Sequence, residues 1–238
     1  MSHAATLLSM LRLAPLLLVF AALPALAADG LLERLAAAAP DADPKVLALA
    51  LQARSCAMTS DGAGSASRLA VIDYSRPSTQ TRLWVFDLKR KSLLFAEVVA
   101  HGQGSGENVP HAFSNRDGSH QSSLGLFRTA ETYQGGNGYS MRMDGLEPGV
   151  NDAARDRLIV MHGAPYVDPL AALKQGRLGR SYGCPAVRPA VARELIDTLK
   201  QGQLLFAYYP DPEWLANSPA LGCRGTATAS VAKARPRA

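Results

Sequence analysis

Short segments rich in β-branched and aromatic residues dominate the middle of this 238-residue chain. RLAVIDY (68–74), RLWVFDL (82–88) and LLFAEVVA (93–100) each have the composition of a strand, and KRKS joins the last two as a β-hairpin. TYQGGNGYSMRMDGL (132–146) predicts a second hairpin, and QLLFAYY (203–209) predicts the final strand. Many strands, glycine-rich turns and few helices favour a β-dominated α+β domain.

Helices are expected at the start of the chain and late in it. Residues 29–58 read as a small helical lead that Pro40 interrupts, with Asp43 as N-cap of the second helix and Pro44 in its first turn. DPLAALKQ (168–175) and PAVARELIDTLK (189–200) predict two further helices. The predicted domains are a signal peptide (1–27), the helical lead and its loop (28–67), the main domain (68–223) and a basic disordered tail (224–238).

The N-terminus has the pattern of a cleavable secretion signal. Arg12 precedes the apolar run LAPLLLVFAAL, and Ala25-Leu26-Ala27 offers the small residues that a signal peptidase needs. We expect a periplasmic or secreted protein without stable membrane insertion after cleavage. An uncleaved membrane anchor is the alternative, since such runs are ambiguous near the length limit.

The net charge of +5 does not indicate a nucleic-acid partner. Residues 28–223 hold all 20 acidic residues and 20 of the 25 Lys and Arg, so this body is formally neutral. The excess lies at the ends of the chain, and no continuous basic groove is predicted.

Export changes the interpretation of the three cysteines. In an oxidising compartment an odd number is most simply one disulfide and one free thiol. Cys56 and Cys223 lie near the two ends of the mature body, so we predict that they pair and leave Cys184 free.

Cys184 lies in RSYGCPAV (180–187), between a flexible glycine and a rigid proline. A thiol becomes a nucleophile as its thiolate, which requires a base or a positive environment. His162 ends the predicted strand RLIVMHG and is the natural base. The N–H groups of Gly183 and Cys184 are candidate oxyanion donors. The alternative is that Cys184 is an inert buried residue and His162 merely ends a strand.

These two segments resemble the catalytic segment of the L,D-transpeptidase (YkuD-type) family, in its murein L,D-transpeptidase-like branch. IVMHGAPYV carries the His-Gly pair of that family's signature, and Ser181, Gly183 and Cys184 match its second part. The resemblance covers roughly residues 68–210. Tyr182 replaces the second histidine of the common motif, and Ala186 stands where that motif has Arg or Asn.

The resemblance implies a YkuD-like β-sandwich with a few short helices and a cysteine acyltransferase acting on peptidoglycan stem peptides. Cys184 would be the nucleophile and His162 the base, with Gly163 orienting the ring through its carbonyl; Ser181, Tyr182 and Gly183 would lie nearby. Family members need no metal or organic cofactor, so none is expected. Acyl transfer to an amine would give a 3→3 cross-link or attach a protein, and transfer to water would give L,D-carboxypeptidase activity.

Further polar residues are weaker candidates for substrate contacts. Arginines beside the nucleophile suit substrate carboxylates, although surface ion pairs are equally compatible with their positions. Ser, Asn and Tyr in the glycine-rich turns suit a groove wall or simply stabilise turns. The candidates are Arg180, Arg188, Tyr133, Asn137 and Ser123, with Ser122 and Tyr139 behind them. His101, His111 and His120 lack the spacing of a zinc pair and are expected to be loop histidines.

Three functions remain open from the sequence: a transpeptidase, a hydrolase with the same nucleophile, and a non-catalytic wall-binding protein. We expect a monomer.

Overall fold

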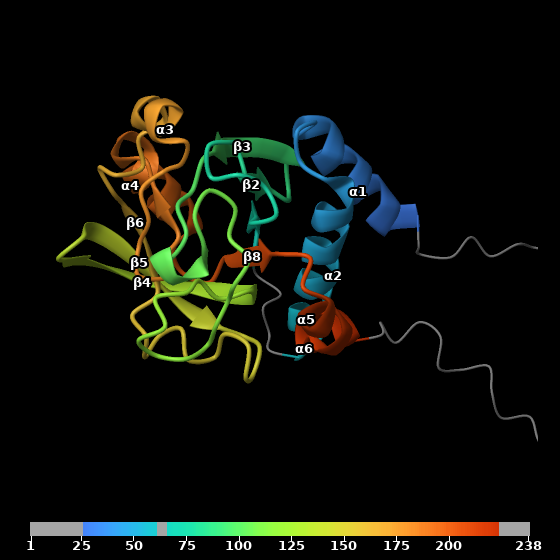
Figure 1. Ribbon diagram of the computed structural model, residues 1–238. Helices are drawn as coiled ribbons and strands as arrows, with labels where there is room; N and C mark the ends of the chain where they lie inside the picture. Colours follow the sequence, from blue (N-terminus) through green and yellow to red (C-terminus); the bar gives the residue numbers. More distant parts are fainter. Residues whose placement is uncertain (1–25, 61–65, 224–238) are drawn as a thin grey trace, which may run out of the picture.

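The computed structural model describes residues 26–60 and 66–223, and its eight strands form one sheet (Figure 1). The strand order is β3-β2-β1-β8-β4-β5-β6-β7. The strands are β1 (Arg68–Asp73), β2 (Leu83–Asp87), β3 (Ser92–Glu97), β4 (Gly125–Gly135), β5 (Gly138–Gly145), β6 (Val160–Gly163), β7 (Ala186–Val187) and β8 (Leu204–Tyr208). The predicted β-dominated α+β class is confirmed.

Within residues 26–60 and 66–223, six helices accompany the sheet, together with a 3₁₀ turn at Gln103–Ser105. They are α1 (Leu26–Ala38), α2 (Pro44–Ser60), α3 (Pro169–Gln175), α4 (Pro189–Leu199), α5 (Pro212–Asn217) and α6 (Pro219–Gly222). Figure 1 shows α1 and α2 (blue) on one side of the view, with α3 and α4 (orange) at the opposite end. No helix within residues 26–60 or 66–223 has the length and apolar character needed to cross a bilayer.

The strand pairing follows the apolar pattern of the sequence. β2 is buried along its whole length and lies between β1 and β3, so it reads as a continuous apolar run. β8 runs parallel to β1 and antiparallel to β4 and thereby joins the two halves of the sheet. Both predicted hairpins form, and Gly138 closes the β4–β5 turn with a left-handed φ of 74°.

The predicted late helices also form, with the expected terminal residues. The Asp168 side chain accepts from the N–H of Leu170 at the start of α3, and Gly176 ends the helix with φ 75°. In α4 the apolar face that contains Leu195 and Ile196 is buried against the sheet. α4 and α3 lie on either side of the segment that carries Cys184 and thereby define its place in the chain.

The helical lead shares the hydrophobic core of the strands. Leu35 of α1 and Ala50 and Ala53 of α2 are completely buried in that core. Cys56 of α2 forms the predicted disulfide with Cys223, just beyond α6, and Cys184 is the free thiol. The domain boundary at residue 67 remains a prediction, and the signal peptide and basic tail lie largely or wholly outside the described residues.

Three elements were not anticipated from the sequence. β7 has only two residues, and α5 and α6 have six and four, too short for a periodic pattern. Their capping signals were nevertheless present, since Asp211 and Ser218 each precede a proline and cap the following helix. Trp214 of α5 and Ser218, the N-cap of α6, both donate hydrogen bonds to the completely buried carboxylate of Glu147.

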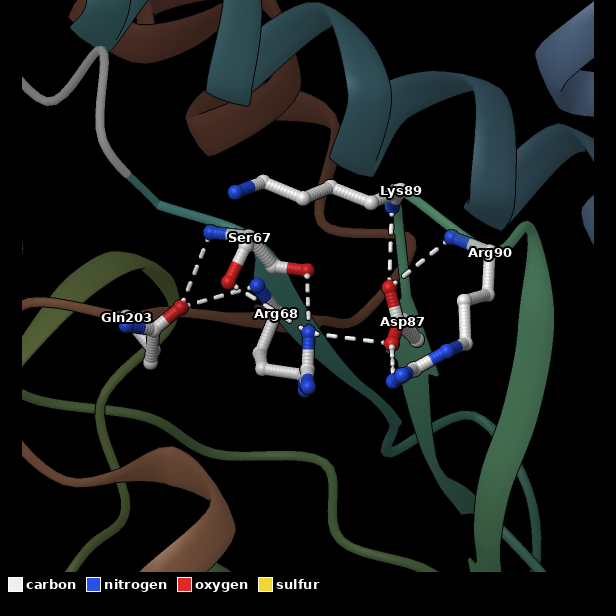
Figure 2. A network of polar contacts seen from close by, with 6 residues as sticks. All are labelled: Ser67, Arg68, Asp87, Lys89, Arg90 and Gln203. Atoms are coloured by element: carbon white, nitrogen blue, oxygen red, sulfur yellow. Dashed lines mark hydrogen bonds and ion pairs between the residues drawn. The ribbon is translucent and has the colours of Figure 1, made fainter.

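A polar network closes the end of the β1–β2 pair (Figure 2). One oxygen of Asp87 accepts the backbone N–H groups of Lys89 and Arg90, both at 2.9 Å. The other oxygen pairs with the Arg68 and Arg90 guanidinium groups at 3.2 and 3.0 Å. Gln203 Oε1 accepts the backbone N–H of Arg68 at 2.8 Å, so the residue before β8 belongs to the same network. The hydrogen bonds that Asp87 accepts, above all the one from the backbone N–H of Arg90, hold the pKa of Asp87 below its usual value.

Asp87→Asn is expected to lower the free energy of unfolding by roughly 1–2 kcal/mol at pH 7, because it removes two ion pairs while keeping an oxygen for the N–H groups. A carboxyl whose pKa is lowered by folding contributes stability above its unfolded pKa of about 3.9 and loses it as pH falls through the folded pKa. Urea titrations should therefore show a difference in the free energy of unfolding between wild type and Asp87→Asn at pH 7, and this difference should shrink below about pH 4. Glu33→Gln, on an exposed position of α1, is the control; equal stability of Asp87→Asn and wild type at pH 7 contradicts the prediction.

Reduction of the disulfide should lower the free energy of unfolding by roughly 2–5 kcal/mol, because the cross-link restricts the unfolded chain over a separation of 167 residues. Thermal unfolding with and without reductant measures this loss. The Cys56→Ala/Cys223→Ala variant should no longer respond to reductant, whereas Cys184→Ala should still do so. Identical melting of the wild type under both conditions would show that the cross-link does not contribute.

Candidate active site

Parallel pairing of β6 with β7 brings the predicted base and nucleophile to one edge of the sheet. His162 in β6 is paired with Ala186 in β7, and Cys184 lies two residues before that partner. α3 occupies the connection between the two strands, as a parallel crossover requires. The fold therefore closes the 22-residue separation that the sequence analysis left to be bridged.

Cys184 and His162 line the same cavity, whose volume is about 480 Å³. The other lining residues come from the loop after β3, the β4–β5 turn, the segment before β6 and the nucleophile turn. They are Gln103, Asn137, Arg157, Leu158, Tyr166, Arg180, Ser181 and Tyr182. A somewhat larger cavity of about 520 Å³ next to Trp214 contains none of the predicted site residues, so we place the candidate active site in the first one.

The Cys184 side chain is 8% exposed and lies against the start of β6. The Val160 N–H donates to its Sγ at 3.4 Å, and Sγ lies 3.6 Å from the Leu158 carbonyl. Burial raises the pKa of the Cys184 thiol, while the Val160 N–H and the positive charge of Arg157 act in the opposite direction. Because the net direction is upward, the resting group at neutral pH is the thiol.

His162 is held in one tautomer by its neighbour. Its Nδ1 lies 3.0 Å from the Gly163 carbonyl. A carbonyl only accepts, so Nδ1 carries the proton and Nε2 keeps a free lone pair. Burial lowers the pKa of His162, and the ring is therefore neutral at neutral pH. The hydrogen bonds of Cys184 Sγ go to the backbone of Val160 and Leu158. Among the described residues, none joins Sγ to the His162 ring.

The turn before the nucleophile is closed by Ser181. Its Oγ donates to the Cys184 carbonyl at 2.7 Å and accepts the Gly183 N–H at 3.1 Å. The Gly183 N–H is therefore hydrogen-bonded within the turn, and its role as an oxyanion donor stays a prediction. Gly183 itself serves the turn through its φ of 123°, a conformation that favours glycine.

The long loop after β3 supports this turn from behind. Ser122 Oγ donates to the Gly183 carbonyl and accepts the Gly102 N–H, both at 3.0 Å. Backbone hydrogen bonds also run from Gln103 to Ser181 and from Ser181 to the carbonyl before Gly102. Gln103 of this loop lines the cavity, whereas Ser122 is not among the lining residues and instead fixes the backbone of the turn.

The five candidate substrate contacts divide into two groups. Asn137 and Arg180 line the cavity, and Arg180 is also ion-paired with Glu107 at 2.8 Å. Arg188, Ser123 and Tyr133 are not among its lining residues.

Each of those three has another partner. Arg188 makes a two-point ion pair with Glu97 at 2.8 and 2.7 Å, which raises the pKa of the arginine. Ser123 Oγ donates to the Ser114 carbonyl. The Tyr133 ring packs beneath the Arg142 guanidinium. The partner of Arg188 lies 91 residues away in the chain, so sequence spacing cannot reveal it.

Tyr182 and Ala186 occupy the positions at which the sequence departs from the common family motif. Tyr182 is 69% exposed at the rim of the cavity, where its ring stacks on His120 with 4.5 Å between centroids. Ala186 is completely buried and pairs with the backbone of Ala100 on its other side. Tyr182 therefore changes the rim of the cavity, whereas Ala186 lies within the sheet.

His101, expected to be a plain loop histidine, is completely buried and structural. The Arg82 guanidinium donates to its Nδ1 at 2.7 Å, so the protonated nitrogen is Nε2, which faces the Gly106 carbonyl at 3.3 Å. Desolvation and the Arg82 charge lower the pKa of His101 to about 3, so it stays neutral. No group of three or more His, Cys, Asp or Glu in the described part of the chain is arranged to hold a metal.

Four cavity residues were not among the sequence candidates: Gln103, Arg157, Leu158 and Tyr166. Arg157 and Leu158 open the predicted strand RLIVMHG, but β6 begins only at Val160 and these two residues lie in a turn before it. Tyr166 lies in the connection before α3. Leu158 has a left-handed φ of 55°, which no composition signal announces.

The model of the L,D-transpeptidase catalytic domain family matches residues 38–208. The chain belongs to this family. The match begins within the helical lead and ends with β8, so it contains the whole candidate active site.

Solved structures of similar proteins include L,D-transpeptidase 1 of Mycobacterium tuberculosis, which has 13% identity and a TM-score of 0.33 over 60% of this chain and 62% of that one. An L,D-transpeptidase of Enterococcus faecium has 16% identity and a TM-score of 0.35 over 60% and 50% of the two chains. The helical cell shape determining protein Pgp2 of Campylobacter jejuni has 10% identity and a TM-score of 0.40 over 61% and 48%. The matched part is less than two thirds of each of these chains. No curated protein matches the sequence.

Gly183→Ala should destabilise the protein by about 1–3 kcal/mol, because φ 123° disfavours a side chain and an added Cβ would lie 2.7 Å from Ile159 Cδ1 and 2.9 Å from the Gln121 carbonyl oxygen. Urea unfolding and the alkylation rate of Cys184 measure the effect. Gly136→Ala is the matched control, since its Cβ would meet nothing within 4 Å. Wild-type stability and alkylation of Gly183→Ala would contradict the tight fit of this turn.

Proposed function

We propose that this protein is an exported cysteine acyltransferase that performs L,D-transpeptidation on peptidoglycan stem peptides. The observation that carries the proposal is the shared cavity of Cys184 and His162 in a chain of the L,D-transpeptidase family. A buried thiol beside a neutral imidazole is suited to attack on a carbonyl when a substrate closes the cavity.

In the first half-reaction, His162 Nε2 takes the proton of the Cys184 thiol as Sγ attacks the carbonyl of the diamino-acid residue in a stem tetrapeptide. The Gly163 carbonyl keeps Nδ1 protonated and so leaves Nε2 available. The C–N bond to the terminal D-alanine then breaks, and the imidazolium returns the proton to the leaving amine. The products are a Cys184 thioester and free D-alanine.

In the second half-reaction, an amine attacks the thioester and gives its proton to His162, and the thiol is regenerated. A side-chain amine of another stem peptide gives a 3→3 cross-link. Water in place of the amine gives a tripeptide, and the protein would then be an L,D-carboxypeptidase. The hydrolase remains the second candidate because Tyr182, exposed at the rim, replaces the family's second histidine.

The negative charge that develops on the oxygen of the attacked carbonyl needs a hydrogen-bond donor inside the cavity. The Gly183 N–H is occupied by Ser181, so we assign this role to the Cys184 N–H alone. Asn137 and Arg180 are proposed to contact the stem peptide, with Tyr182 at the rim. The Ser181 hydroxyl donates to the backbone carbonyl of Cys184 and so fixes the backbone at the proposed nucleophile.

We place the mature protein in the periplasm or outside the cell, as a monomer that begins after Ala27. The signal-like N-terminal sequence supports export, and so does the Cys56–Cys223 disulfide, which is stable in an oxidising compartment. Cleavage after Ala27 would remove only the first two residues of α1.

Purified wild type incubated with a disaccharide-tetrapeptide should release D-alanine and give cross-linked dimers, which mass spectrometry distinguishes from tripeptide. Cys184→Ala should abolish turnover, and His162→Ala should reduce the rate by roughly 10²–10⁴, the usual cost of removing a general base. His111→Ala, an exposed loop histidine, is the matched control. Tripeptide without dimers would favour the hydrolase, and turnover by Cys184→Ala would end the proposal.

The rate should also depend on pH in a stated direction. Because burial lowers the pKa of His162, its neutral form persists below the usual imidazole range, and turnover should fall only as pH drops through that lowered pKa. A rate that already halves above pH 6.5 would contradict the assignment of His162 as a neutral buried base.

A further inference from the structure

Arg157 is the most extensively hydrogen-bonded side chain of the cavity. One terminal nitrogen of its guanidinium donates to the Ser114 carbonyl and to Ser123 Oγ. The other donates to Ser119 Oγ at 3.1 Å and to the Gln121 carbonyl at 2.8 Å. All four acceptors belong to one segment, residues 114–123, so the guanidinium holds this segment against the cavity.

The same guanidinium is close enough for its charge to act on the candidate nucleophile. Arg157 directly precedes Leu158 and is three residues before Val160, and these two residues supply the backbone groups that contact Cys184 Sγ. Arg157 and Cys184 line the cavity together. Their charges attract each other: the Arg157 charge acts to lower the pKa of the thiol. Burial lowers the pKa of Arg157 itself, and the charges of Asp117 and the thiolate oppose that lowering.

Other titratable groups near the sulfur do not supply a positive charge. His162 is kept neutral by burial. Burial raises the pKa of Tyr74 and of Tyr166 to about 12, so both phenols stay protonated. Arg180 lines the cavity, but it is ion-paired with Glu107. Among the groups that the structure describes around the cavity, Arg157 is therefore the cation suited to a thiolate.

The segment held by Arg157 also touches the nucleophile turn. A Cβ on Gly183 would lie 2.9 Å from the Gln121 carbonyl oxygen, which shows how closely this backbone approaches the turn. Ser122, the next residue, donates to the Gly183 carbonyl. Displacement of the guanidinium would therefore change both the charge beside the sulfur and the support of the turn.

We propose that Arg157 is a positioning residue whose guanidinium, fixed by residues 114–123, stabilises the thiolate of Cys184. It acts through the cysteine and transfers no proton itself. This deepens the proposed function, because the resting His162 carries no charge to stabilise a thiolate before substrate binds. The proposal rests on Cys184 as the nucleophile, but its test reads thiol reactivity and does not require turnover.

The test is the pH profile of Cys184 alkylation by iodoacetamide in the full chain with its disulfide intact, read by intact mass. Arg157→Gln should move the midpoint upward by about one pH unit and slow alkylation about tenfold at a fixed pH below it, the size expected for loss of a nearby opposite charge. Arg157→Lys should recover part of the shift. Arg155→Gln is the matched control: it removes a neighbouring arginine that pairs with Glu131 and Asp144 at the surface.

A folded Arg157→Gln protein with the wild-type midpoint would overturn the proposal, and so would an equal shift in Arg155→Gln. If Arg157→Gln does not fold, Ser119→Ala/Ser123→Ala gives a milder test: it keeps the charge but removes two of the four acceptors, and the midpoint should rise. An unchanged midpoint in that variant overturns the positioning role.

The outcome also separates this proposal from the proposed function. An Arg157-dependent midpoint without stem-peptide turnover keeps the former and removes the latter. Stem-peptide turnover together with a midpoint that does not depend on Arg157 keeps the proposed function and removes the role of Arg157.

Discussion

The short parallel contact between β6 and β7 is the constraint on which the site depends. Two residue pairs, His162 with Ala186 and Gly163 with Val187, join chain segments that α3 separates. Gly163 is close to α4 at this point, since an added Cβ would lie 2.8 Å from that of Ala192. Position 163, whose carbonyl contacts the ring of His162, therefore requires a small residue. Without this pairing, neither the imidazole nor the sulfur would face a common cavity.

Burial at the site serves reactivity by keeping both reacting groups uncharged at rest. A thiol and an imidazole removed from water avoid the desolvation cost of an ion pair, and the backbone of β6 satisfies the sulfur. The Val160 N–H and the charge of Arg157 act in the opposite direction to burial and favour the thiolate.

The sequence predicted both hairpins, the longer strands and the late helices, because each had a composition or capping signal of its own, but it missed the two-residue strand β7. It also predicted the free Cys184 and the cross-link between Cys56 and Cys223. It could not predict Arg157, whose significance comes entirely from acceptors 34–43 residues away in the chain. Gly183 illustrates the same limit: its conformation was anticipated, but the serine that occupies its N–H was not.

The central claim is that a stem peptide enters the cavity and is attacked by Cys184. The most direct measurement is to mix the full chain with a disaccharide-tetrapeptide, stop the reaction in acid after one turnover time, and locate the added mass by peptide mapping. The account predicts a thioester of the tripeptide-bearing fragment on Cys184. An unmodified Cys184 in protein whose thiol still reacts with iodoacetamide would contradict it.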